Sequence, residues 1–344
     1  MEKIIIPFQI NKRGRPLGAI FVGLAPLALI LISVFLGRYP LSVSEILTLV
    51  TAWATQGEIN PIHHSLVFYV RLPRAILAAL VGGSLAVCGA AFQGLFRNPL
   101  VSSGMLGVSS GAGFGAALAL ILFDTTAYVY GFSFGFGLVA VGLCVVIGRF
   151  CSSNQAVTLV LGGVIVGSVF SALISFLKYV ADPYDELPAI VFWLMGSLSR
   201  AEYPVILTAG IPMVLGATGL FVIRWRLNVL AMGDREARAL GLNLTWNRIF
   251  IIVCATLATA SAVCVSGVIG WIGLVVPHMG RMIMGNNNRN LIPVAFSLGA
   301  CFLILVDTIS RVISSSEIPL GILTALVGGP FFIYLLKQTR GSRW

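Results

Sequence analysis

The chain has 344 residues, of which 58% are hydrophobic and only 10% are charged. Soluble globular proteins carry about 25% charged residues, so this composition excludes a soluble domain and indicates an integral membrane protein. The chain has 22 Lys and Arg against 12 Asp and Glu, and its hydrophobic residues form long runs without a period of 2 or 3.6. No globular unit fits between these runs, so we expect a single transmembrane domain over residues 1–344.

The hydrophobic runs predict an all-α fold with ten membrane segments. A helix needs about 20 apolar residues to cross the hydrocarbon core. The first run follows a basic stretch, as in a signal peptide, but it lacks a small-residue cleavage site and is expected to remain as a span. The run 272–284 is short and contains Pro277, which predicts a short helix inside the bundle. The other nine runs are 17–36, 74–96, 104–122, 130–150, 156–178, 204–224, 248–270, 291–310 and 318–337.

The basic residues assign the two sides of the membrane. With ten segments, both termini lie on one side together with the loops near 97–103, 149–155, 224–248 and 281–290. This side holds sixteen of the 22 Lys and Arg, and the positive-inside rule therefore places it, with both termini, in the cytoplasm. The remaining six are Arg38, Arg71, Arg74, Lys178, Arg200 and Arg311.

Glycine spacing predicts close helix packing. Gly107, Gly111 and Gly115 are four residues apart, and the pairs Gly163–Gly167 and Gly131–Gly135 share that spacing. In membranes, small residues at this spacing let helix backbones approach one another closely.

The longest cytoplasmic loop, 224–248, contains a predicted short helix. Residues 233–241 have a helix start, an Ala-rich turn and a terminal glycine. The helix could be a connector that lies on the membrane surface, or a projection that docks into a groove of a partner. Its mixed charge suits a protein partner better than anionic lipid, which favours an all-basic face.

Three arginines on the outer side are exceptions to the positive-inside rule. Arg71 and Arg74 precede the second span, while Arg311 ends the ninth and is spaced to pair with Asp307 on one helix face. Each arginine could simply extend to the interface. For the three together we favour a basic patch that meets an acidic partner or substrate.

The outer segment 178–203 is predicted to contain a short apolar helix around Trp193 that ends near Gly196. Trp193 could be an interfacial anchor. Alternatively, the helix could cover the outer mouth of a transport pathway.

Several functional motifs are missing from the sequence. There is no G-x-x-x-x-G-K-[ST] loop, no H-E-x-x-H and no G-x-S-x-G, and the six cysteines include no C-x-x-C pair. We therefore expect no catalytic residue, no metal site, no cofactor in this chain and no enzyme activity. Charged residues are almost absent from the span interiors, whereas ion-coupled transporters usually need them, so the energy for transport should come from a partner.

In its motifs the sequence resembles the FecCD family, the permease subunits of binding-protein-dependent ABC importers for iron–siderophores, haem, vitamin B12 and some oxyanions. The resemblance runs from about Arg71 to Leu336. The matching pieces are Arg71-Leu-Pro-Arg74, Gln93 with Arg97-Asn-Pro-Leu100, Leu106-Gly-Val-Ser-Ser-Gly-Ala112, Trp193-Leu-Met-Gly-Ser-Leu198, Gly267-Val-Ile-Gly-Trp-Ile-Gly-Leu274, Pro277-His-Met-Gly-Arg281, Asp307 with Arg311, Glu317-Ile-Pro-Leu-Gly321 and Gly328-Gly-Pro-Phe-Phe332.

The resemblance implies a type II ABC importer permease fold in a prokaryotic inner membrane. Its partners would be a second copy of the chain, two cytoplasmic ATPase subunits that bind ATP and Mg²⁺, an extracytoplasmic binding protein and the lipid bilayer, with no role for nucleic acid. Arg71, Arg74 and Arg311 resemble the residues that receive acidic side chains of the binding protein.

The same resemblance assigns two cytoplasmic sites. The cytoplasmic gate would lie at the start of the fifth span, at Gln155, Ala156, Val157 and Thr158. The ATPase coupling residues would be Gly233, Asp234, Glu236, Ala237, Arg238, Leu240 and Gly241.

The sequence therefore predicts a permease that moves a metal chelate or related substrate inward by ATP-driven alternating access. An ion-gradient-driven secondary transporter is the alternative, and it would need an intramembrane acid or a broken-helix ion site. A membrane-embedded enzyme would need a polar cluster inside the spans, and none is evident. The pathway segments do not select one substrate.

Overall fold

The computed structural model describes residues 15–39, 41–42, 44–46, 48–49, 51, 60–123, 125–150, 155–314 and 316–338. All regular secondary structure in these residues is helical. Each of the ten predicted membrane segments coincides with a helix. These helices are α1 (Arg15–Phe35), α4 (Leu72–Phe96), α5 (Val108–Leu122), α6 (Thr126–Phe150), α7 (Gln155–Val180), α9 (Tyr203–Val222), α12 (Leu244–Ser266), α13 (Ile272–Met284), α14 (Asn288–Ile313) and α15 (Leu320–Gln338).

Five shorter elements join or extend these helices. They are α3 (Pro61–His64), the π-helix η1 (Ser65–Arg71), α8 (Glu186–Met195), α10 (Arg224–Met232) and α11 (Asp234–Ala239). The short helices predicted within 178–203 and 233–241 are thus present as α8 and α11. Within the described residues, six helical stretches are long and apolar enough to cross a membrane, and the other apolar helices are shorter.

The second span is longer than its apolar run suggested. Helix begins at Pro61, capped by the Asn60 side chain, and continues through α3 and η1 into α4 as far as Phe96. The polar residues of this extension, including His63 and His64, end the hydrophobic signal although the helix itself continues. Proline suits the first helical position because its missing N–H would be unpaired there in any case.

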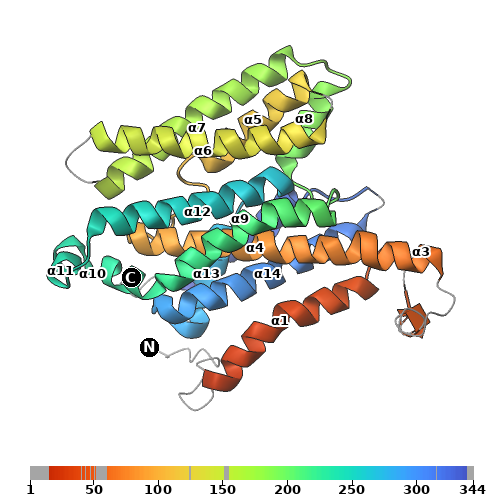
Figure 1. The fold of residues 1–344 in the computed structure, drawn as a ribbon, viewed down its shortest axis with the longest axis horizontal. Helices are drawn as coiled ribbons and strands as arrows, with labels where there is room; N and C mark the ends of the chain where they lie inside the picture. Colours follow the sequence, from red (N-terminus) through yellow and green to blue (C-terminus); the bar gives the residue numbers. More distant parts are fainter. Residues whose placement is uncertain are drawn as a thin grey trace.

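Helix α4 lies at the centre of the bundle. It contacts α14, α12, α9 and α13, and 89% of the apolar window of the 61–96 stretch is buried. In Figure 1, α5, α6, α7 and α8 lie together on one side of α12, while α4, α9, α13, α14 and α1 lie on the other. The corresponding windows of α6 and α7 are only 33% and 28% buried, so these two helices form an open side of the chain.

Glycine contacts fix the closest helix approaches. A Cβ at Gly82 of α4 would lie 2.2 Å from the Gly299 carbonyl of α14, so neither helix tolerates a side chain there. Gly111 and Gly115 pack equally closely against the α6 backbone, as their spacing predicted. By contrast, a Cβ at Gly131 or Gly135 would meet no atom of the described residues within 4 Å, so the prediction of close packing is wrong for this pair within that part of the chain.

Candidate functional site

A buried charge cluster lies where α4 begins and α14 ends. Asp307 of α14 is 1% exposed and its Oδ1 accepts a 2.8 Å hydrogen bond from Nε of Arg74. Its other oxygen lies 3.1 Å from Nε of Arg311, one turn further along α14. The i,i+4 pair predicted from sequence is therefore present, and Asp307 also joins α14 to α4.

The same cluster reaches the loop before α15 and the end of α1. The guanidinium of Arg74 donates two parallel hydrogen bonds of 2.8 Å to the carboxylate of Glu317. Arg71 donates to the carbonyl oxygens of Val34, at 2.6 Å, and Tyr39. Bidentate arginine–carboxylate pairs are among the stronger polar contacts in proteins, so the cluster fastens four segments together.

The three arginines proposed for docking are buried in this structure. Arg71, Arg74 and Arg311 are 2%, 4% and 6% exposed, so they do not form the surface patch that their sequence positions suggested. The physical reason is that Asp307 and Glu317 compensate the charges of Arg74 and Arg311, while backbone carbonyl oxygens accept the hydrogen bonds of Arg71. The accessible members at this end are Glu317, whose side chain is 31% exposed, and Arg38. A docking role for the three arginines stays a prediction.

The predicted coupling helix, α11, has its own start and stop signals. Gly233 precedes it at φ +137°, and Gly241 follows it at φ +79°, a conformation that favours glycine. The N–H of Leu242 donates to the carbonyl of Ala237 at 3.0 Å, and the N–H of Leu240 donates to that of Glu236. These bonds satisfy carbonyls at the end of the helix.

One side of α11 is anchored to the bundle and the other is exposed. Ala237 is fully buried. Asp234 binds Arg248 of α12 at 2.7 Å and lies 3.5 Å from Arg97 at the end of α4. In contrast, Met232 at the end of α10 and Leu240 directly after α11 are 63% and 61% exposed. The exposed members of the predicted coupling set are Glu236, Arg238, Leu240 and Gly241.

Three polar contacts brace this end of the bundle, and none of them was predicted from the sequence. The Gln93 side chain of α4 donates to the carbonyl of Val101 and accepts a 2.5 Å hydrogen bond from Arg281 of α13. Asn228 of α10 donates to Asn287 at the start of α14. Gln93 belongs to the motif pieces, but only the tertiary contacts explain the need for a polar side chain there.

The predicted gate residues begin α7. Gln155 and Ala156 are helical, and their side chains lie outside the described part of the chain. Val157 is 53% exposed, and Leu161 and Val164 further along α7 are 57% and 55% exposed. The gate remains a prediction, and its helix presents a continuous apolar face.

A cavity of about 440 Å³ lies at the end of the bundle that holds Glu317. Hydroxyl and aromatic groups line it together with Arg200. Because its walls come from five separate segments, sequence reasoning had no signal for it. Among the described residues, no three His, Cys, Asp or Glu side chains are close enough to hold a metal ion. The polar lining residues include Tyr130, Ser197, Ser199, Ser266 and Glu317.

The long spans, the buried charge cluster and the surface helix α11 occur here in one chain, and comparison with known proteins assigns the family. The model of the FecCD transport family matches residues 25–338. The chain belongs to the FecCD transport family. Members of this family are transmembrane permease subunits of ABC importers in the inner membrane of prokaryotes, and they are transport components rather than enzymes.

Individual relatives cover most of the FecCD chain. The molybdate import system permease protein MolB of Haemophilus influenzae is 41% identical over 310 residues, which are 89% of this chain and 92% of MolB. The hemin transport system permease protein HmuU of Yersinia pestis is 36% identical over 282 residues, 80% of this chain and 84% of HmuU.

A solved structure supports the fold over a similar length. It is described as an inward-facing conformation of a metal-chelate type ABC transporter, and it is similar with a TM-score of 0.85 and 37% identity over 94% of this chain and 99% of that one. The membership confirms the family, the fold class and the importer function predicted from sequence. The secondary transporter has no support.

Proposed function

We propose that α11 is the element through which a cytoplasmic ATPase subunit moves the spans of this importer permease. The observation that carries the proposal is the two-sided placement of α11. Asp234 and Ala237 fasten it to α4 and α12, while Met232 and Leu240 stay exposed among charged side chains. Exposed apolar groups within a polar rim are typical of a docking surface. ATP and Mg²⁺ would bind the ATPase subunit, because this chain lacks a phosphate-binding loop.

The test replaces the exposed apolar side chain that directly follows α11. In Leu240→Gln, substrate uptake by proteoliposomes should fall while the permease remains folded, and less ATPase subunit should copurify. The matched control is Trp246→Gln, because Trp246 is also 61% exposed but belongs to α12. Normal uptake and normal ATPase capture by Leu240→Gln would exclude α11 as the coupling element.

We also propose that an extracytoplasmic binding protein docks over the buried charge cluster. The cluster contains Arg71, Arg74 and Arg311 against Asp307 and Glu317, which leaves one excess positive charge for an acidic partner. Glu317 occupies the fork of Arg74 from the accessible side. Replacing Glu317 with Gln should therefore strengthen the binding of an acidic partner, as measured by surface plasmon resonance with the permease in nanodiscs. Unchanged or weaker binding would contradict this role.

A homodimer and the orientation of the chain belong to the same proposal. The apolar face of α7 is exposed in the single chain, with Leu161, Val164 and Phe176 at 57%, 55% and 60%, and it supports contact with a second copy.

The α10–α11 end carries Arg224, Arg235 and Arg238, which supports a cytoplasmic location for this end and for both termini. Cross-linking between cysteines introduced on α7, and reporter fusions after Trp344, test these two statements.

The substrate class proposed is a metal chelate, haem, cobalamin or related compound such as an oxyanion. Support comes from the relatives: MolB is named as a permease for molybdate, and HmuU is named as a permease for hemin. Uptake of radiolabelled molybdate and of hemin by the reconstituted importer would separate these classes.

A further inference from the structure

A groove between α6 and α12 is not explained by transport or docking. It has a volume of about 620 Å³ and is lined by both helices and by Leu159 of α7. Lining residues such as Val146 and Val253 are 50% and 56% exposed, so the groove is open to the surroundings of the bundle. Both helices are long and apolar enough to cross a membrane, and those surroundings are therefore lipid.

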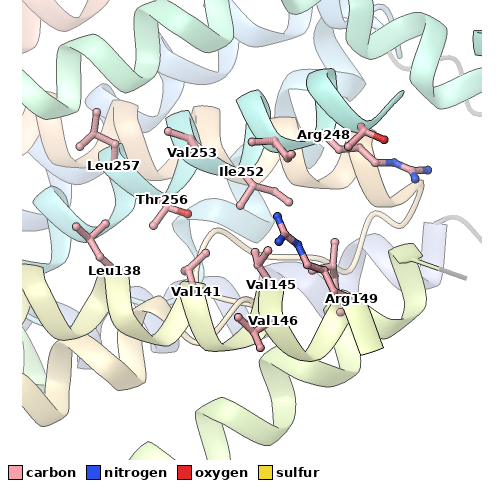
Figure 2. A pocket seen from close by; sticks show the side chains of 15 residues that line it. Leu138, Val141, Val145, Val146, Arg149, Arg248, Ile252, Val253, Thr256 and Leu257 are labelled. Atoms are coloured by element: carbon pink, nitrogen blue, oxygen red, sulfur yellow. The ribbon is translucent and has the colours of Figure 1, made fainter. Parts of the chain in front are cut away.

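The walls are apolar, but a cation lies at one end. Val141, Val145 and Ile252 face one another across the groove, and the guanidinium of Arg149 reaches from α6 into the space beside Ile252 (Figure 2). Arg248 points away from this space, toward Asp234, whose carboxylate it binds at 2.7 and 2.8 Å. Arg149 is therefore the charge that a ligand in the groove would meet.

A second polar group lies deeper in the groove. Thr256 of α12 is 5% exposed, and in the described part of the chain no hydrogen-bond partner lies within reach of its hydroxyl oxygen. Figure 2 shows the hydroxyl between α12 and α6. Thr256 follows Ile252 by one turn, which places it about 6 Å further from the end marked by Arg149. A buried hydroxyl without a partner costs free energy that a ligand acceptor would recover.

We propose that this groove is a binding site for an anionic phospholipid of the adjoining leaflet. The lipid phosphate pairs with Arg149, an ester oxygen accepts the Thr256 hydroxyl proton, and one acyl chain lies along Val141 and Ile252. Basic pockets between helices at a membrane interface favour anionic headgroups in this way. Charge complementarity selects a lipid over an apolar helix of another protein, because an apolar helix would leave Arg149 unpaired.

The chain offers matched variants for the test. A Cβ at Gly142, which lines the groove, and one at Gly131, elsewhere on α6, would both meet open space. Gly142→Phe adds an aromatic ring to the groove from a position with room for the Cβ, and Gly131→Phe adds the same group outside it. Arg149→Gln removes the charge in the groove, and Arg289→Gln removes an exposed charge on the first turn of α14.

The experiment measures lipid retained by the full chain. The protein is equilibrated in vesicles of phosphatidylglycerol and phosphatidylcholine with identical acyl chains, and bound lipid is counted by native mass spectrometry. We expect phosphatidylglycerol to be preferred, Arg149→Gln to lower that preference about fivefold, and Gly142→Phe to abolish retention. Thr256→Val should weaken retention of both lipids.

Three outcomes with the variants would overturn the proposal, and one with a competing anion would do the same. The three are an unchanged preference in Arg149→Gln, equal losses in Gly142→Phe and Gly131→Phe, or an Arg289→Gln variant as weak as Arg149→Gln. Displacement of the lipid by millimolar inorganic phosphate would show that the groove recognises the free anion and not the lipid.

Discussion

Two groups of charged side chains, at opposite ends of α4, hold this permease together in different ways. Where α4 begins, Arg74 and Asp307 meet at 2.8 Å with side chains only 5% and 1% exposed. Where it ends, Arg97 lies 3.5 Å from Asp234, and both side chains are about two-fifths exposed. The first group lies inside the bundle, with Glu317 partly exposed at its edge, and the second is open to solvent and to partners.

The difference in burial decides what each group can do. A buried charge needs its counter-ion, because removal of one partner leaves an uncompensated charge away from water. A solvated pair contributes little to stability and can exchange its partner at low cost. We infer that the buried cluster fixes the geometry of the spans. The ion pairs of Asp234, in contrast, position the surface around α11 that we propose contacts the ATPase subunit.

The largest expected effect is at the centre of the buried cluster. Asp307→Asn leaves Arg74 and Arg311 without their shared carboxylate, and it should reduce the free energy of unfolding by about 3–5 kcal/mol. Thermal unfolding in detergent micelles measures this loss. The matched control, Asp185→Asn, changes an exposed carboxylate and should stay within about 0.5 kcal/mol of the wild type. Equal effects of the two variants would remove the contrast between the clusters.

Glu317→Gln should have a smaller effect, of about 1 kcal/mol, because the side chain is 31% exposed and solvent screens its charge. Burial raises the pKa of Glu317, but the hydrogen bonds and the charge of Arg74 lower it by more. The pKa therefore lies below the ordinary value for glutamate. A lowered folded-state pKa adds stability above the unfolded pKa and loses it as the pH falls through the folded one.

The stabilisation that Glu317 provides should depend on pH. The gap in melting temperature between wild type and Glu317→Gln should be constant near neutral pH and close below about pH 4.3, the usual value for glutamate. A gap that persisted at lower pH would show that the charge of Glu317 is not what stabilises the loop before α15.

At the open end the expected loss of stability is smaller again. Asp234→Asn should lower the free energy of unfolding by less than about 1 kcal/mol, although Asp234 has two arginine neighbours. Calorimetry of the detergent-solubilised chain measures this value. A loss as large as that of Asp307→Asn would mean that α11 is part of the structural core.

Salt gives the smallest effect and separates the two groups directly. Raising the salt from about 0.1 M to 1 M shortens the screening length from about 10 Å to 3 Å. The difference between wild type and Asp234→Asn should then shrink, while that between wild type and Asp307→Asn should not change. Melting curves at both salt concentrations check this, and a parallel response would contradict the difference in solvent access.

The spans were predictable because the signal for each one, a run of apolar residues, lies in one continuous segment of the sequence. The ten apolar runs became helices within a few residues, and the glycine-bounded segment 233–241 became α11. The i,i+4 pairing of Asp307 with Arg311 was predictable for the same reason. Other features needed contacts between distant segments. Arg74 pairs with Asp307 across 233 positions, and Gln93 meets Arg281 across 188.

The sequence by itself determined a membrane location, the helical segments and the family, because hydropathy and motifs are properties of short stretches of chain. Only the tertiary structure decided that Arg71, Arg74 and Arg311 are enclosed, and that Gly82 fits against Gly299 while Gly131 meets open space. The physical reason is that burial and charge compensation depend on which helices meet. An arginine next to a span has the same sequence signal whether it faces water or a buried carboxylate.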